Sequence, residues 1–426
     1  MKPSSLTPAT EQIIATLDGI GATDLAGDRQ AQIAVAAAAR RMLARIQTPF
    51  EHVLRYQIDA GIAATCQVLL DLGLWKGWTE AGGKDASLVQ LVDYCSPVAP
   101  DMNLLGRLLR YLASEYVVKE VGVNMYRPTA YSLELGKPTS ATTQALLVCD
   151  HHWLDSCRHM PAFLAKTGYQ EPLDPVQSNY ADWTPEKLTL FARMQTNPAY
   201  AVSFTGWMAG LVGYKADWTD AYDTKDLVEG FFREREKTNS SSGESSGSGT
   251  LLVDIGGSHG LDVSSLLAKH PDLPAGSLVL QDLTHVTAHA RVDPDKVTVM
   301  AHDFFDPQPV RGEPGLPPAR DPARLGRPGL PADPAARVGG HDARTGVSMY
   351  QAAVDTGLMF LVSARERTEG QWRLLLKSAG FRVQAIWWPA VSGTEAVIEA
   401  ELCDGDDDEG EEDGGEDYNN EDEEEE

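Results

Sequence analysis

The stretch LLVDIGGSHG, residues 251–260, decides the fold class of this chain. An apolar run ends in Asp254, and a helical stretch, LDVSSLLAKHP, follows a turn that contains Gly256, Gly257 and Gly260. This order predicts a buried parallel strand whose C-terminal turn lets a ligand approach the backbone closely. The glycines do not follow the dinucleotide spacing G-x-G-x-x-G, which favours a nucleoside ligand without a pyrophosphate.

Two later strand ends carry acids as well. The run SLVLQDL ends in Asp282, about 20 residues after the glycine turn, where a carboxylate is placed to bind the ribose hydroxyls of a nucleoside. A third run, VTVMAHDFFDPQPV (297–310), carries Asp303 and Phe304 at its tip. A purely structural role, such as capping the next turn, stays the alternative for each acid.

These stretches together resemble the methyltransferase fold that binds S-adenosylmethionine and, more narrowly, the plant-type O-methyltransferase family of fungal secondary metabolism. Residues 104–133 resemble the helix and wing of this family. The segment ARERTEGQWRLLLKSAGFRV (364–383) resembles its ERT signature, and GTEAVIEAEL (393–402) resembles its last strand. The order of the blocks carries the resemblance, because no single block is specific.

The resemblance implies an α/β fold, with a Rossmann-like methyltransferase domain preceded by a mainly helical, winged-helix-like dimerisation domain. It implies methyl transfer from S-adenosyl-L-methionine to an aromatic hydroxyl of a small secondary metabolite, by a homodimer. The expected parts are the dimerisation domain (1–150), a helical substrate-pocket region (151–238), a Ser/Gly linker (239–249), the methyltransferase domain (250–402) and an acidic disordered tail (403–426).

The resemblance also implies roles for individual residues around the cofactor. Asp254, Gly256 and Gly257 would face its methionine end, and Asp282 would bind its ribose. Asp303 would lie near the adenine amino group, with Phe304 on the face of the ring.

The catalytic half of the site is not visible in the sequence. In the family an H-D-W motif carries the base, and Glu366 matches the glutamate that orients this histidine. Residues 311–346 stand in its place, and 26 of these 36 residues are Gly, Pro, Ala or Arg. The His341–Asp342 pair inside this segment is a weak candidate base, because it lacks the Trp and lies too far along the chain.

The composition of 311–346 predicts a loop or disorder, because so few apolar side chains cannot offset the entropy of ordering. One interpretation is a genuine low-complexity insertion. The other is a GC-rich exon read out of frame, since Gly, Pro, Ala and Arg have GC-rich codons. Two functional alternatives follow: a catalytically inactive protein that only binds the cofactor, and a winged-helix regulator. The regulator has a thin basic footprint, Arg107 and Arg110.

The amino-acid composition narrows the classes of function and partner that remain. The net charge is −26, and residues 404–426 hold 16 acids and no base. The acidic balance argues against nucleic acid as a partner, because phosphate contacts need Lys and Arg. No run approaches the about 18 apolar residues of a membrane span, and the five cysteines are irregularly spaced. We therefore expect a cytoplasmic protein without membrane or nucleic-acid partners.

The segment CDHHWLDSCRHM raises the question of a metal site. Its candidate ligands are Cys149, His151, His152, Cys157 and His159. These residue types bind zinc, but their spacing is tight for one tetrahedral ion. We expect no metal here, because isolated His and Cys side chains on buried helices are common.

Overall fold

The computed structural model describes residues 6–21, 23–212, 217–242, 249–310, 349–388 and 396–403. The segment 311–346 and the acidic residues after Cys403 lie outside this described part, so their predicted disorder stays a prediction. The chain divides into two compact units. The first comprises Met1–His151 and Ala199–Gly210, and the second comprises His152–Pro198 and Leu211–Glu426.

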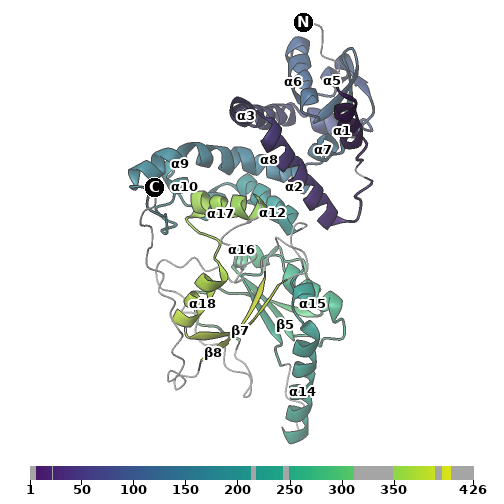
Figure 1. The fold of residues 1–426 in the computed structure, drawn as a ribbon. Helices are drawn as coiled ribbons and strands as arrows, with labels where there is room; N and C mark the ends of the chain where they lie inside the picture. Colours follow the sequence, from purple (N-terminus) through teal and green to yellow (C-terminus); the bar gives the residue numbers. More distant parts are fainter. Residues whose placement is uncertain are drawn as a thin grey trace. The chain divides into compact units, whose positions relative to one another are not determined.

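The first unit is mainly helical, as its apolar periodicity predicts (Figure 1). Its helices are α1 (Pro8–Asp18), α2 (Arg29–Ile46), α3 (Pro49–Asp71), α4 (Leu74–Glu80), α5 (Leu88–Asp93), α6 (Met102–Ser114), α7 (Ala130–Leu135), α8 (Ala141–Val148) and most of α12 (Pro198–Val212). At the N-termini of most of these helices a side chain accepts a backbone N–H group. Examples are the capping boxes that start α3 at Thr48 and α5 at Ser87.

A small antiparallel sheet completes this unit. Its strands β1 (Ala86–Ser87), β2 (Val118–Gly122) and β3 (Met125–Pro128) pair in the order β1-β3-β2. Helix α6 buries Leu105, Leu109 and Leu112 against a core that includes two tryptophans of α4. The predicted helix-then-wing pattern is therefore confirmed as α6 followed by the β2–β3 hairpin.

The second unit begins in a π-helical turn, η1 (Cys149–Trp153), which leads into α9 (Leu154–Lys166). Its other helices are α10 (Asn179–Trp183), α11 (Leu190–Thr196), α13 (Trp218–Ala221), α14 (Thr224–Ser242), α15 (Leu261–Lys269), α16 (Thr284–Thr287), α17 (Met349–Val362) and α18 (Glu369–Ser378). Helix α14 continues four residues into the range predicted as a linker. The helix formers Glu234, Arg235, Glu236 and Lys237 precede that range and favour one more turn.

Three parallel strands form the centre of the second unit. They are β4 (Leu252–Ile255), β5 (Leu278–Asp282) and β6 (Val297–Ala301), in the order β4-β5-β6. Helix α15 packs on β4 and β5, and its apolar face joins their buried core. β7 (Phe381–Trp387) and β8 (Val397–Leu402) pair antiparallel, which confirms the predicted last strand. The predicted parallel α/β fold is confirmed.

No single helix among the described residues is long and apolar enough to cross a membrane. The bent pair α3 and α4 passes the same test of length and composition when the two helices are taken together.

The packing of α6 is testable by truncation. Leu109 is 0% exposed, whereas Leu104 on the same helix is 46% exposed. We predict that Leu109→Ala lowers the free energy of unfolding by about 3 kcal/mol, because it leaves a cavity in the core. Leu104→Ala should change it by less than about 1 kcal/mol. Urea denaturation of both variants measures the difference, and equal losses would contradict this packing.

Candidate active site

The carboxyl ends of β4, β5 and β6 form one edge of the parallel sheet. Because neighbouring parallel strands run in the same direction, Asp254, Asp282 and the segment after Ala301 reach this edge together. The structure therefore brings the acids predicted from sequence to one side of the sheet. Ligands of open α/β sheets bind outside the carboxyl ends of the strands.

The glycine turn after β4 is held by the next strand. The N–H groups of Gly256 and Gly257 donate to the carbonyl oxygen of Gln281, at 2.8 and 3.2 Å. Gly256 has a φ of +72°, in the left-handed region that favours glycine. At Gly257 an added Cβ would lie 2.2 Å from Asp254 Oδ2 and 2.5 Å from Leu280 Cδ1. A Cβ here would overlap both side chains, so only glycine fits at this position.

Asp254 places a buried oxygen beside Gly257. In the described part of the chain, no hydrogen bond reaches its Oδ2 atom. Burial raises the pKa of Asp254 to about 6, and the negative charges of Asp262 and Asp282 add to the effect. A buried acceptor without a donor is costly, so the site suits a ligand group that donates hydrogen bonds or carries positive charge.

Asp282 is used differently from Asp254. Its Oδ2 accepts the N–H of Ser258 at 2.9 Å, and its Oδ1 accepts the N–H of Leu283 at 2.7 Å. The carboxylate thus fastens the glycine turn to the end of β5. A carboxylate has about four lone-pair positions, so both oxygens keep capacity for a further donor. Its ribose role stays a prediction.

His259 in the same turn is a residue that sequence reasoning passed over. Its Nδ1 lies 3.0 Å from Ser258 Oγ, and its carbonyl accepts the N–H of Arg291 at 3.0 Å. Burial lowers the pKa of His259, with further lowering from the positive charges of Arg291 and His289 and an opposing effect from Asp282. The turn therefore carries a largely neutral imidazole at physiological pH.

Asp303 and Phe304 follow β6 at the same edge. Asp303 Oδ1 accepts the N–H of Phe305 at 3.0 Å and stabilises the turn that presents Phe304. The rings of Phe304 and Phe305 are tilted, with centroids 4.6 Å apart. Phe304 is half-buried and Phe305 is exposed. The adenine role of Asp303 and Phe304 stays a prediction.

Two glutamines that were not predicted connect these loops. Gln281 Nε2 donates to Gln308 Oε1 at 2.8 Å, and Gln308 Nε2 donates to Gln281 Oε1 at 2.9 Å. The sequence signal was a polar residue inside an otherwise apolar strand, SLVLQDL.

Glu366 lies after α17, and its side chain is half-buried. Its N–H donates to Asp355 Oδ1 at 2.7 Å, and the neighbouring Arg365 forms an ion pair with Glu171 at 3.0 Å. The candidate base His341 lies outside the described residues. The pairing of Glu366 with a catalytic histidine therefore stays a prediction.

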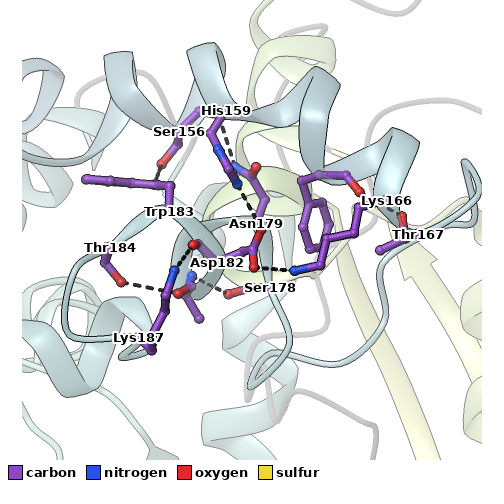
Figure 2. Close-up of polar contacts among 12 residues, drawn as sticks. Ser156, His159, Lys166, Thr167, Ser178, Asn179, Asp182, Trp183, Thr184 and Lys187 are labelled. Carbon is purple, nitrogen blue, oxygen red and sulfur yellow. Dashed lines mark hydrogen bonds and ion pairs between the residues drawn. The ribbon is translucent and has the colours of Figure 1, made fainter.

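A second polar cluster lies between α9 and α10 (Figure 2). Asp182 accepts His159 Nε2 at 2.9 Å and Lys166 Nζ at 2.6 Å, and these two partners lower the pKa of Asp182, Lys166 more strongly. Beside it, Trp183 Nε1 donates to Ser156 Oγ at 2.8 Å. These contacts join the two helices and give the cluster a structural role.

The same region offers no zinc site among the described residues, where no group of three candidate ligands occurs. His152 Nδ1 lies 2.6 Å from the Tyr180 hydroxyl, and His159 bonds Asp182. The two imidazoles thus have protein partners in place of a shared ion.

Comparison with known proteins identifies the family. No protein-family model matches the chain. The O-methyltransferase ATR12 of Stachybotrys chlorohalonatus is 34% identical over 412 residues, which cover 92% of this chain and 98% of that protein. The chain belongs to the fungal O-methyltransferase family. The predicted family and enzyme class are thus confirmed, and the winged-helix regulator receives no support.

Solved structures agree with the fold of this O-methyltransferase. The LepI complex with SAM superposes with a TM-score of 0.72 at 24% identity, covering 93% of this chain and all of that chain. A structure described as a pericyclic reaction enzyme gives a TM-score of 0.70 at 24% identity, with the same coverage. At this identity the likeness establishes the fold alone.

The environment of Asp254 predicts how its charge affects stability. Its pKa is about 6 in the folded protein and 3.8 in the unfolded chain, so between these values the folded state binds more protons. The contribution of this group to stability therefore falls as the pH rises through this window. We predict that Asp254→Asn is more stable than the wild type at pH 8, and that the difference shrinks at pH 5. Urea midpoints at both pH values measure it, with Asp295→Asn as an exposed control; a difference independent of pH would refute the assignment.

Proposed function

We propose that this O-methyltransferase binds S-adenosylmethionine at the carboxyl edge of β4–β6 and methylates a hydroxyl oxygen of an aromatic secondary metabolite. The observation that carries the cofactor site is the buried Oδ2 of Asp254 beside Gly257, which no hydrogen-bond donor reaches in the described part of the chain. An ammonium group within hydrogen-bond distance of that oxygen would supply both a donor and a compensating charge.

Different residues at this edge would bind different parts of the cofactor. Asp254, Gly256 and Gly257 would hold its methionine end, Asp282 its ribose, and Asp303 with Phe304 its adenine. When bound, S-adenosylmethionine supplies an electrophilic methyl group on a sulfonium. The part of the chain is to fix that group relative to the acceptor oxygen, which converts an encounter in solution into a positioned reaction.

The acceptor needs help from a base. A phenol with a pKa of about 10 is ionised to only about one part in a thousand at pH 7. A general base contributes about 10² to 10⁴-fold to such a proton transfer. Glu366 would orient a histidine base, and His341 is the candidate in the printed sequence. In this proposal the base comes from 311–346, whereas every residue assigned to the cofactor lies before residue 311.

Because the cofactor residues and the base lie in separate segments, a second candidate function follows: a protein that binds the cofactor without methylating an oxygen. Two observations favour it. The sequence 311–346 contains no H-D-W motif, and the same fold occurs in a structure described as a pericyclic reaction enzyme.

Calorimetry with S-adenosylhomocysteine, followed by a methyl-transfer assay on a panel of phenols, separates the two candidates. Micromolar binding with turnover supports the methyltransferase. Micromolar binding without turnover of any phenol supports the second candidate. A folded protein that does not bind refutes both.

The glycine turn provides a sharper test of the cofactor site. We predict that Gly257→Ala weakens S-adenosylhomocysteine binding by about tenfold or more, because the new methyl group occupies the space beside Asp254 Oδ2. Gly370→Ala in α18 is the matched control, since an added Cβ there meets nothing within 4 Å. Calorimetry measures the affinities, and thermal unfolding shows that both variants are folded. Equal affinities would place the ligand elsewhere.

We further propose that the first unit forms a homodimer through α1–α3. No residue of α1 is buried. Large apolar side chains stay exposed along all three helices: Ile13, Ile14, Leu17, Ile33, Val35, Leu43, Ile46, Phe50, Val53 and Tyr56. An exposed apolar surface of this extent is typical of an interaction site, and the implied dimerisation role of this domain assigns it to a second copy of the chain.

We predict that the wild type elutes with about twice the 46.2 kDa mass of one chain. Phe50→Asp, at a site 70% exposed, should shift it towards the monomer. Val123→Asp, at a site 91% exposed in the β2–β3 turn, should leave the mass unchanged. Light scattering after size exclusion at micromolar concentration gives the masses. A monomeric wild type would contradict the proposal.

A further inference from the structure

Gln281 is a buried amide in the central strand of the parallel sheet. Its side chain is 0% exposed, and its neighbours Leu278 and Leu280 belong to the apolar core. An amide in such a place is costly unless its donor and acceptor are both satisfied. In this apolar core the side-chain amide of Gln281 therefore needs a polar partner.

Gln308 is that partner, and the two amides bond reciprocally. Each Nε2 donates to the Oε1 of the other residue, at 2.8 and 2.9 Å. Gln308 Oε1 also accepts the N–H of Val310 at 3.1 Å, and Gln281 Nε2 lies 3.3 Å from Met300 Sδ. The pair fixes the orientation of both amides and fastens the segment FFDPQPV onto β5.

The backbone of Gln281 makes a second connection. Its carbonyl oxygen accepts both N–H groups that fix the glycine turn, from Gly256 and Gly257. One residue thus holds the turn beside Asp254 through its carbonyl and the loop of Asp303 and Phe304 through its amide. These are the two sides of the proposed cofactor site.

We infer that the Gln281–Gln308 amide pair is a positioning device that sets the spacing between the glycine turn and the Asp303–Phe304 loop, and thereby the affinity for the cofactor. The inference rests on the proposed function. Both glutamines are positioning residues, because they act through the loops that they hold.

The pair has a pH-dependent test. In Gln308→Glu a protonated carboxyl keeps one acceptor and one O–H donor, and so reproduces the amide pairing. An ionised carboxylate instead places a second acceptor against Gln281 Oε1. Burial favours the neutral form and extends it towards physiological pH.

Affinity for S-adenosylhomocysteine is measured by calorimetry at pH 8 and pH 5.5 and expressed relative to the wild type at the same pH, which removes the common titration of Asp254. We expect Gln308→Glu to bind about tenfold more weakly at pH 8 and to approach the wild type at pH 5.5. Gln308→Ala should stay weak at both pH values. The control is Gln384→Ala, whose amide bonds Glu401 on β8 at 2.8 Å, and it should bind as the wild type does.

A second measurement, made without ligand, tests whether the Gln281–Gln308 pair couples the two loops. Amide hydrogen exchange of the free protein should rise in Gln308→Ala both at 303–310 and at 255–260, and should not change there in Gln384→Ala. A rise at 303–310 alone would overturn the coupling between the loops. Wild-type affinity in both Gln308 variants at pH 8, or equal weakness of Gln308→Glu at both pH values, would overturn the positioning role. A wild type that does not bind would refute the proposed function, and hydrogen exchange would still decide the coupling.

Discussion

The hydrogen bonds of the central strand β5 are the constraint on which the proposed cofactor edge depends. Parallel strands that are covered on both faces are buried, and each polar group inside them needs a partner. The backbone carbonyl of Gln281 accepts the N–H groups of the glycine turn, and its side-chain amide bonds Gln308 in the segment after β6. Asp282 then fixes Ser258 and Leu283. The loops of the site are therefore shaped by the requirement to satisfy β5.

Asp254 is the exception at this edge, and the proposed cofactor site rests on it. Strand β5 accepts the N–H groups of the glycine turn beside Asp254. Asp254 Oδ2, however, receives no hydrogen bond in the described part of the chain. Burial and two nearby acids disfavour its ionised form. Such a group lowers the stability of the folded protein at neutral pH, and a donating ligand relieves that cost. If the cofactor binds as proposed, stability and ligand affinity are coupled at this carboxylate.

Much of this arrangement could be predicted from sequence, because it is encoded locally. The apolar runs before Asp254 and Asp282 predict β4 and β5, and the glycines predict a turn where no Cβ fits at Gly257. Contacts between distant segments could not be predicted. The bond from Ser258 to Asp282 and the pairing of Gln281 with Gln308 depend on strand register, which spacing does not fix. The extent of α14 also escaped prediction, because helix propagation outweighed the serines that suggested a linker.

The residues proposed to bind the cofactor and those proposed for catalysis come from different parts of the chain. Each residue proposed to bind the cofactor lies before residue 311 and on the edge of β4–β6. Glu366 follows α17, and the histidine proposed to pair with it, His341, lies in 311–346. β5 has a neighbour on each side and is mostly buried, while β4 is only half-buried along its length. A parallel strand of this kind normally needs cover on both faces and a second neighbour. The printed sequence of 311–346 contains no apolar run that could serve as one. The bonds that Gln281 and Asp282 make to the glycine turn involve only residues before 311, so the proposed cofactor edge is held together without that segment.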